Sequence, residues 1–188
     1  MKTAVIFSVL AFAAAAFAAP NPTAVEPPTK VTRDLATVTS VIAQVSAAIV
    51  QLDTAVNAYT GDKTELEEEA ASLVSILESG TTAIAASSAL SIVDALSLSS
   101  LVDSLQDLGD QLVSDLVAKR SVVEEEDYCE EVEDQIVEIA TDARALVEAI
   151  IAKAPAIAQG IAEALAEEFY ATLDEGSWAF ATGNCTDA

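Results

Sequence analysis

The stretch that decides the fold is residues 35–59, which read LATVTSVIAQVSAAIVQLDTAVNAY. Its apolar side chains recur in alternating steps of three and four, at Leu35, Val38, Ile42, Val45, Ile49, Leu52, Val56 and Tyr59. This spacing places all of them on one side of a long helix. Such a stripe needs other helices to bury it, so the rest of the chain must supply them.

Further apolar series of helical spacing follow along the chain. Thr32 is the predicted N-cap of the first helix, and Thr60-Gly61-Asp62 ends it near Tyr59. Asp62 and Glu65 have the spacing of a capping box for the second helix. The later series are Leu66, Ala70, Leu73, Leu77 and Ile84; Leu101, Leu105, Leu108, Leu112 and Leu116; Val132, Ile136, Ile139, Ala143, Leu146 and Ile150; and Ile157, Ile161, Leu165 and Phe169.

Small residues and prolines set the other helix boundaries. Because of Gly80, the sequence does not fix where the second helix ends. Asp94 either begins a new helix or continues a kinked one. Gly109 weakens its helix by about 1 kcal/mol relative to Ala and permits close helix contact. Pro155 ends or kinks the fourth helix near residue 154. The sequence therefore predicts an all-α, antiparallel bundle of about five helices, with an irregular C-terminal tail from Leu173.

Charge and composition exclude several classes of function. The chain has 188 residues, 8 Lys+Arg against 31 Asp+Glu, no His and a net charge of −23. Such a surface repels phosphate backbones and anionic membranes, which argues against nucleic-acid binding. Hydrophobic residues make up 52% of the chain and are periodic, which argues against disorder. Aromatic residues make up only 5% of the chain, and Ala is abundant. This composition is compatible with a densely packed core and with a core that contains a cavity.

The N-terminal residues are predicted to be removed from the mature protein. Residues 1–18 combine a basic start, an apolar run of roughly 14 residues and an Ala-x-Ala end, which is typical of a secretory signal peptide. The alternative, a membrane anchor, needs roughly 18 to 20 apolar residues, so we expect no transmembrane segment. Residues 19–32 form a Pro-rich arm, and residues 33–188 a single helical-bundle domain.

The secretory route makes a disulfide between Cys129 and Cys185 the expected state, and this bond would tie the tail back to the bundle. Two free thiols or an intermolecular pair are the alternatives. Closing this loop would stabilise the fold by roughly 4 kcal/mol in the entropic description. Asn184-Cys185-Thr186 is a formal glycosylation sequon, which a disulfide at its middle position would hinder.

Charged clusters in the second half of the chain have plain structural interpretations. The acidic residues 124–134 lack the Gly turn of a calcium loop, so an acidic first turn of a helix is favoured over a calcium site. Lys119-Arg120 is interpreted as a basic helix C-terminus, with a processing site as the alternative.

The residue inventory favours a non-enzyme. Without His, and with both Cys residues paired, Ser-His and Cys-His nucleophilic sites and zinc sites lack their usual groups. Buried carboxylate pairs are missing from the apolar stripes. We therefore expect no catalytic residue, no metal and no cofactor.

The order of short motifs resembles a fungal protein family. These motifs are Arg33-Asp34-Leu35, Tyr59-Thr60-Gly61, Leu90-Ser91, Asp94-Ala95-Leu96, Lys119-Arg120 and Lys153-Ala154-Pro155. Between about Arg33 and Tyr170 the chain resembles hydrophobic surface-binding protein A and the cell-wall galactomannoproteins. The resemblance implies a helical bundle, secreted or associated with the cell wall, that binds long-chain fatty acids in an apolar channel; some members act as antigens. The Cys pair and the lack of a Ser/Thr-rich tail depart from the family pattern and favour a freely secreted form.

The resemblance leads to the hypothesis of a lipid tunnel between the helices. Its expected apolar lining is Val38, Ile42, Val45, Ile49, Leu105, Leu108, Leu112, Ile136, Ile139, Leu146 and Ile150. Ser46, Ser104 and Gln111 are the expected polar residues that would bind the head group. The alternative for each apolar residue is an ordinary place in the core.

Two other functions remain open at this point. The helices could present their stripes to a hydrophobic solid such as wax or polyester, which would make the chain a surface-active protein. The chain could also be a secreted effector or antigen that binds a host protein. The expected partner is a fatty acid or other amphipathic lipid, and the expected state is a monomer.

Overall fold

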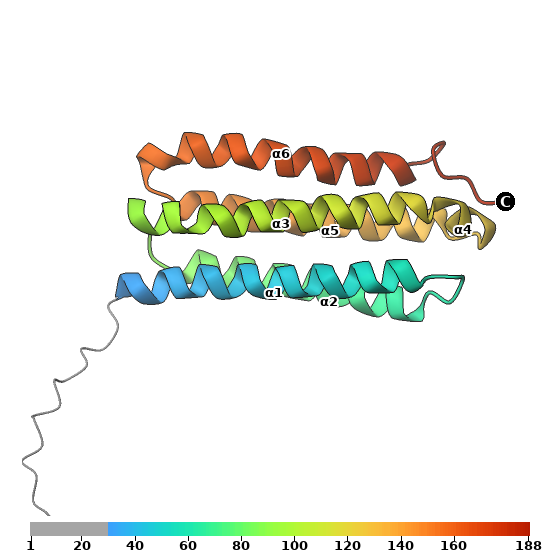
Figure 1. Cartoon of the computed structure of the whole chain (residues 1–188), viewed down its shortest axis with the longest axis horizontal. Helices are drawn as coiled ribbons and strands as arrows, with labels where there is room; N and C mark the ends of the chain where they lie inside the picture. The colour runs from blue at the N-terminus through green and yellow to red at the C-terminus, as the bar shows by residue number, and fades with distance from the viewer. Residues whose placement is uncertain (1–29) are drawn as a thin grey trace, which may run out of the picture.

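The computed structural model describes the backbone of residues 30–188 and the side chains of residues 34–188. The predicted signal peptide and nearly all of the predicted arm lie outside the described residues. The helices are α1 (Lys30–Ala58), α2 (Thr64–Ala86), α3 (Ile92–Ala118), α4 (Arg120–Glu125), α5 (Cys129–Lys153) and α6 (Ala156–Phe180). The five long helices alternate in direction along the chain, which confirms the predicted all-α bundle (Figure 1).

The five long helices close into a ring. The main contacts join α1 to α2 and α3, α2 to α5, α5 to α6, and α6 back to α3. Each long helix therefore has two principal neighbours. Because the chain alternates in direction, α1, α3 and α6 point one way, and α2 and α5 point the other way (Figure 1).

Helix α1 is the most deeply buried element, as its stripe predicts. Seven of the eight stripe residues, from Val38 to Tyr59, are buried in the core. By length and composition the segment Asp34–Ala58 could also span a membrane. In the structure its apolar side is instead covered by α2 and α3, as in the core helix of a bundle.

The helix ends differ in detail from the predicted ones. Helix α1 begins at Lys30, so Thr32 lies inside it rather than capping it. The predicted capping box at α2 does not form: Lys63 is the N-cap, and the Asp62 carboxylate accepts the backbone N–H of Thr64. A capping box forms instead at α3, where Ser91 and Asp94 bond each other's backbone N–H groups. This box shows that Asp94 opens a new helix.

The prediction of an irregular chain from Leu173 is wrong, because α6 continues to Phe180. Phe180 is fully buried, while Trp178 stays 67% exposed. The predicted disulfide between Cys129 and Cys185 is confirmed. The residues after α6 fold over the start of α5, where Asp187 accepts the backbone N–H of Cys129.

Two lysines hold parallel neighbours together at their C-terminal ends. Lys119 Nζ, at the end of α3, donates to the carbonyls of Asn57 and Tyr59 at the end of α1, at 2.7 and 3.1 Å. Lys153 Nζ, at the end of α5, donates to the carbonyls of Ala85 and Ser87 at the end of α2, both at 2.8 Å. Each ammonium group thus satisfies orphan carbonyls and opposes the negative dipole end of the adjacent helix. Lys119 was predicted to face a helix C-terminus, and that helix is α1 rather than its own.

Gly80 sets the distance between α1 and α2. A Cβ atom built on Gly80 would lie 2.6 Å from Cγ1 of Val41, which is closer than van der Waals contact allows. By contrast, a Cβ on Gly160 in α6 would meet nothing within 4 Å. One glycine is therefore required by packing, and the other is not.

We predict that Lys119→Met and Lys153→Met each lower the free energy of unfolding by about 1–2 kcal/mol, because each leaves two helix-end carbonyls without a charged donor. Chemical denaturation followed by circular dichroism measures the effect. Arg120→Met is the matched control, since its side chain makes only a half-exposed ion pair at 3.9 Å; it should change stability by less than about 0.5 kcal/mol. Equal losses in all three variants would refute the inter-helix capping.

We also predict that Gly80→Ala destabilises the protein by about 1–3 kcal/mol through overpacking. Gly160→Ala should instead stabilise it by about 0.5–1 kcal/mol through helix propensity. Adding Val41→Ala to Gly80→Ala should recover part of the loss, which a double-mutant cycle measures. Additive effects at these two positions would be inconsistent with the contact.

Candidate functional site

An apolar cavity of about 100 Å³ lies inside the ring, and all five long helices line it. Helices α1 and α2 contribute Val45, Ile49, Leu52, Val56, Leu66, Ala70, Leu73 and Leu77. Helix α3 contributes Gly109, Leu112, Val113 and Leu116, and α6 contributes Phe169, Thr172, Leu173 and Gly176. Helix α5 contributes Val132, Gln135, Ile136, Ile139 and Ala143. The only polar side chains in this lining are Gln135 and Thr172.

Small residues on four helices make the space. Ala70, Gly109, Ala143 and Gly176 all line the cavity, at positions where larger side chains would fill it. Gly109 was interpreted as a site of close helix contact, but a Cβ there would lie an ordinary 3.9 Å from the nearest atom, in Phe169. The missing side chain therefore leaves room in the cavity rather than bringing helices together.

Gln135 belongs to a polar chain at one end of the cavity. Its Nε2 donates to the hydroxyl oxygen of Tyr128 at 3.0 Å, and that hydroxyl donates to Oε1 of Glu67 at 3.0 Å. Burial raises the pKa of Tyr128, and the hydrogen bond to Glu67 raises it further. Tyr128 therefore stays a neutral donor at physiological pH. The bond to Tyr128 uses one of the two N–H groups of Gln135.

Thr172, the second polar residue of the lining, is committed to the contact between α3 and α6. Its hydroxyl donates to Oδ1 of Asp110 at 2.6 Å and accepts from Nε2 of Gln106 at 2.8 Å. A hydroxyl has a single proton to donate. Since Asp110 takes that proton, Thr172 is a weaker donor toward the cavity than Gln135.

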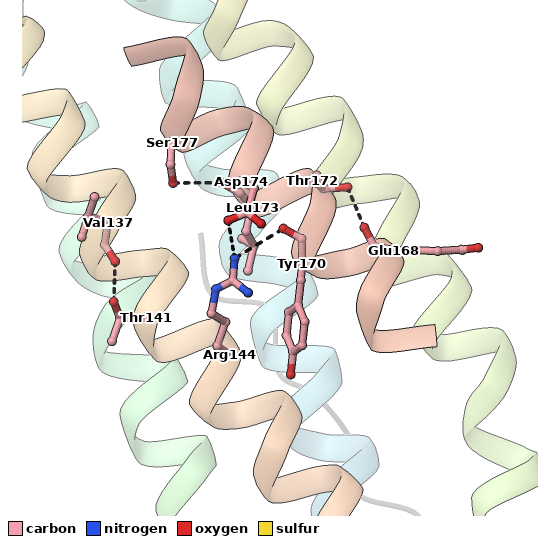
Figure 2. A network of polar contacts seen from close by, with 9 residues as sticks. All are labelled: Val137, Thr141, Arg144, Glu168, Tyr170, Thr172, Leu173, Asp174 and Ser177. Carbon is pink, nitrogen blue, oxygen red and sulfur yellow. Dashed lines mark hydrogen bonds and ion pairs between the residues drawn. The ribbon is translucent and has the colours of Figure 1, made fainter. Parts of the chain in front are cut away.

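Arg144 joins α5 to α6 at the side of the ring. Figure 2 shows its guanidinium between Asp174 and Tyr170. Nη2 lies 2.6 Å from Oδ1 of Asp174 and 3.4 Å from the carbonyl oxygen of Tyr170, and the guanidinium carbon lies 4.7 Å from the centre of the Tyr170 ring. These contacts hold α6 against α5 next to the cavity-lining residue Leu173.

The structure brings five of the predicted lining residues together at this cavity: Val45, Ile49, Leu112, Ile136 and Ile139. The other six, which are Val38, Ile42, Leu105, Leu108, Leu146 and Ile150, belong to the core outside the cavity. None of the three predicted polar residues lines the cavity: Ser46 is half-buried, and Ser104 and Gln111 are exposed and bond within α3.

Sequence reasoning missed Gln135, Thr172 and the α2 and α6 walls. The apolar stripes of α2 and α6 have the same helical spacing as the other three. The sequence could therefore have predicted a lining with residues from all five helices. Gln135 interrupts the apolar series of α5 one position before Ile136, and no pattern in the sequence distinguishes it from a surface residue.

Known proteins match most of the chain. A family model described as Hydrophobic surface binding protein A matches residues 35–169. The curated proteins named Cell wall mannoprotein 1 of Aspergillus flavus and Aspergillus fumigatus are 30% and 31% identical over 139 and 150 residues. These matches cover 73% and 79% of this chain but 51% and 52% of the relatives. The chain thus spans about half the length of the curated relatives it matches.

Solved structures share the fold. Ligand binding domain 1 of the Penicillium marneffei MP1 protein, complexed with arachidonic acids, has a TM-score of 0.76 and 25% identity, over 79% of this chain and 99% of that one. AFMP4P in complex with palmitic acid has a TM-score of 0.73 and 21% identity, over 78% and 99% of the two chains. By the match to residues 35–169, the chain belongs to the hydrophobic surface binding protein A family.

Proposed function

We propose that the chain is a secreted, non-enzymatic lipid-binding protein that holds a long-chain fatty acid inside the helix ring. The observation that carries the proposal is the cavity, which is lined by every long helix and is apolar except at Gln135 and Thr172. The related MP1 domain was solved with arachidonic acids, and AFMP4P, which shares the fold, with palmitic acid. The names of the curated relatives support secretion and association with the cell wall, and the disulfide fits the secretory route.

The size of the cavity sets a condition on binding. A volume of about 100 Å³ accommodates roughly seven to ten water-sized groups, whereas palmitic acid has roughly 18 non-hydrogen atoms. The lining must therefore give way when an acyl chain enters, or part of that chain lies beyond the cavity. The cavity can widen because each helix satisfies its backbone hydrogen bonds internally. The helices of the ring can therefore move apart without breaking a backbone hydrogen bond.

We infer that Gln135 binds the carboxylate of the fatty acid. Its second amide N–H is available, and it stands at an apolar site where a hydrogen bond to a charged oxygen is strong. The acyl chain would then extend along α5 and α6 past Ala143 and Phe169.

A substitution that fills the cavity tests the proposal. We predict that Ala143→Leu weakens fatty-acid binding more than tenfold, because the three added carbon atoms occupy the space of about three methylenes. Ala140→Leu is the matched control: Ala140 is buried on the same helix but does not line the cavity, so affinity should stay within about twofold. Competition between a fluorescent fatty acid and oleate measures both affinities.

Saturable binding by the wild type with about one ligand per chain supports the proposal. Equal affinity of Ala143→Leu and the wild type would refute the placement of the ligand in this cavity.

A second substitution tests the head-group contact. We predict that Gln135→Leu weakens oleate binding about tenfold, the value of one lost hydrogen bond to a charged group. Binding of methyl oleate, which has no charge to hold, should change less than threefold. Thr172→Val is the control, because its hydroxyl is already bonded to Asp110. If Thr172→Val discriminates the two ligands and Gln135→Leu does not, the carboxylate lies at the α3–α6 contact instead.

A further inference from the structure

Six of the nine large exposed apolar residues of the described chain lie at one end of the bundle. On α3 they are Ile92, Val93 and Leu96, and on α6 they are Ile157, Ile161 and Leu165. Helices α3 and α6 are neighbours that point the same way, so both N-terminal halves lie at the same end, on the left in Figure 1. We call these six residues the α3/α6 patch. Monomeric proteins rarely leave such a cluster uncovered without a partner.

The patch is continuous with the wall of the cavity. Ile157, Ile161, Leu165, Phe169 and Leu173 follow one another in steps of four, so they form one stripe that winds around α6, turning by about 40° at each step. Exposure along it falls from 78% at Ile157 to 68% at Ile161 and 41% at Leu165. Phe169 and Leu173, the next two, line the cavity. The stripe therefore leads from solvent to the interior of the ring.

The opposite end of the ring is closed. Tyr128 and Phe180 are buried there, and Cys185 is bonded to Cys129 beside them. The last residues of the chain fold across the turn before α5, where the backbone N–H of Ala188 donates to the carbonyl of Glu124. The exposed apolar patch therefore lies at the end of the bundle that the covalently fastened tail does not cover.

The charges around the patch select the kind of surface it fits. Asp94 and Glu163 flank it on α3 and α6. Lys153, at the same end of the bundle, is already bonded to the carbonyls of Ala85 and Ser87. An acidic rim repels anionic lipid head groups, so the matching surface is uncharged or zwitterionic.

We propose that the α3/α6 patch docks the protein on a zwitterionic lipid surface, from which the acyl chain passes along the α6 stripe into the cavity. The docking step stands on the exposed residues, and the transfer step rests on the proposed function. Docking gives the exposed residues at this end a role, and an acyl chain too long for the cavity can lie along the α6 stripe.

A triple variant tests the docking. Leu96→Gln/Ile157→Gln/Ile161→Gln removes three exposed apolar side chains without touching the core. Val50→Gln/Val137→Gln/Trp178→Gln is the matched control, since these residues are 47%, 49% and 67% exposed and lie outside the patch. Binding of the ligand-free proteins to vesicles is measured by flotation in a density gradient. One set of vesicles is phosphatidylcholine, and in the other one third of the lipid is phosphatidylglycerol.

The expected result is flotation of the wild type and the control with phosphatidylcholine, and weaker flotation with the anionic vesicles. The patch variant should bind phosphatidylcholine vesicles about tenfold more weakly. A wild type that stays at the bottom of the gradient overturns the proposal, as does an equal loss in the control. A dimer that dissociates in the patch variant, seen by sedimentation velocity without flotation, would identify a second copy as the occupant instead.

Transfer is measured with a fluorescent fatty acid carried in the same vesicles. Its rate of transfer to the wild type should rise with vesicle concentration and fall about tenfold in the patch variant, while affinity in vesicle-free solution stays within about twofold. A rate independent of vesicle concentration overturns transfer by docking and leaves the proposed function intact. Failure of the wild type to bind fatty acid in vesicle-free solution refutes the proposed function itself, whatever the flotation shows.

Discussion

Five helices packed in a closed ring cannot also touch across its centre, and the rest of the structure depends on this constraint. Helix axes in contact lie roughly 8–10 Å apart, which places each axis of a regular five-membered ring roughly 8 Å from the centre. Because the Cα atoms of a helix lie roughly 2.3 Å from its axis, a channel remains along the centre of the ring that side chains must fill. Large side chains fill it toward the ends of the bundle. In the cavity Ala70, Gly109, Ala143 and Gly176 do not, and the space stays open.

The same ring makes the two ends of the molecule unlike. Three helices point one way and two the other, so helices of the same direction are neighbours and their like dipole ends lie side by side. Lys119 and Lys153 offset this repulsion at the C-terminal ends of α1 and α2. The disulfide and the tail close one end, while the start of α6 leaves its apolar face uncovered at the other. The two ends of the bundle therefore differ: the tail covers one end, and apolar side chains are exposed at the other.

Much of the fold could be predicted from the sequence, because the spacing of apolar residues and the positions of helix-breaking residues are local features. The stripe of residues 35–59, the break at Gly61, the stop at Pro155 and the Cys129–Cys185 pair all appear as predicted. The cavity could not be placed in the same way. Whether Ile42 or Ile49 faces the cavity depends on the height along the bundle axis at which the small residues of four helices lie side by side. That height follows from how the helices are aligned in the bundle, which the sequence does not show. Ser104 and Gln111 adjoin an apolar stripe in the sequence, yet the rotation of α3 places both side chains outside the cavity.

The central claim is that the ring holds a lipid, and native mass spectrometry of the mature chain tests it most directly. The protein should be secreted from a eukaryotic host and purified without organic solvent, so that any ligand it acquires is retained. The account predicts a discrete mass increment equal to one or two fatty acids, lost on denaturation. A chain that carries no added mass, and acquires none after incubation with oleate or palmitate, would contradict the account.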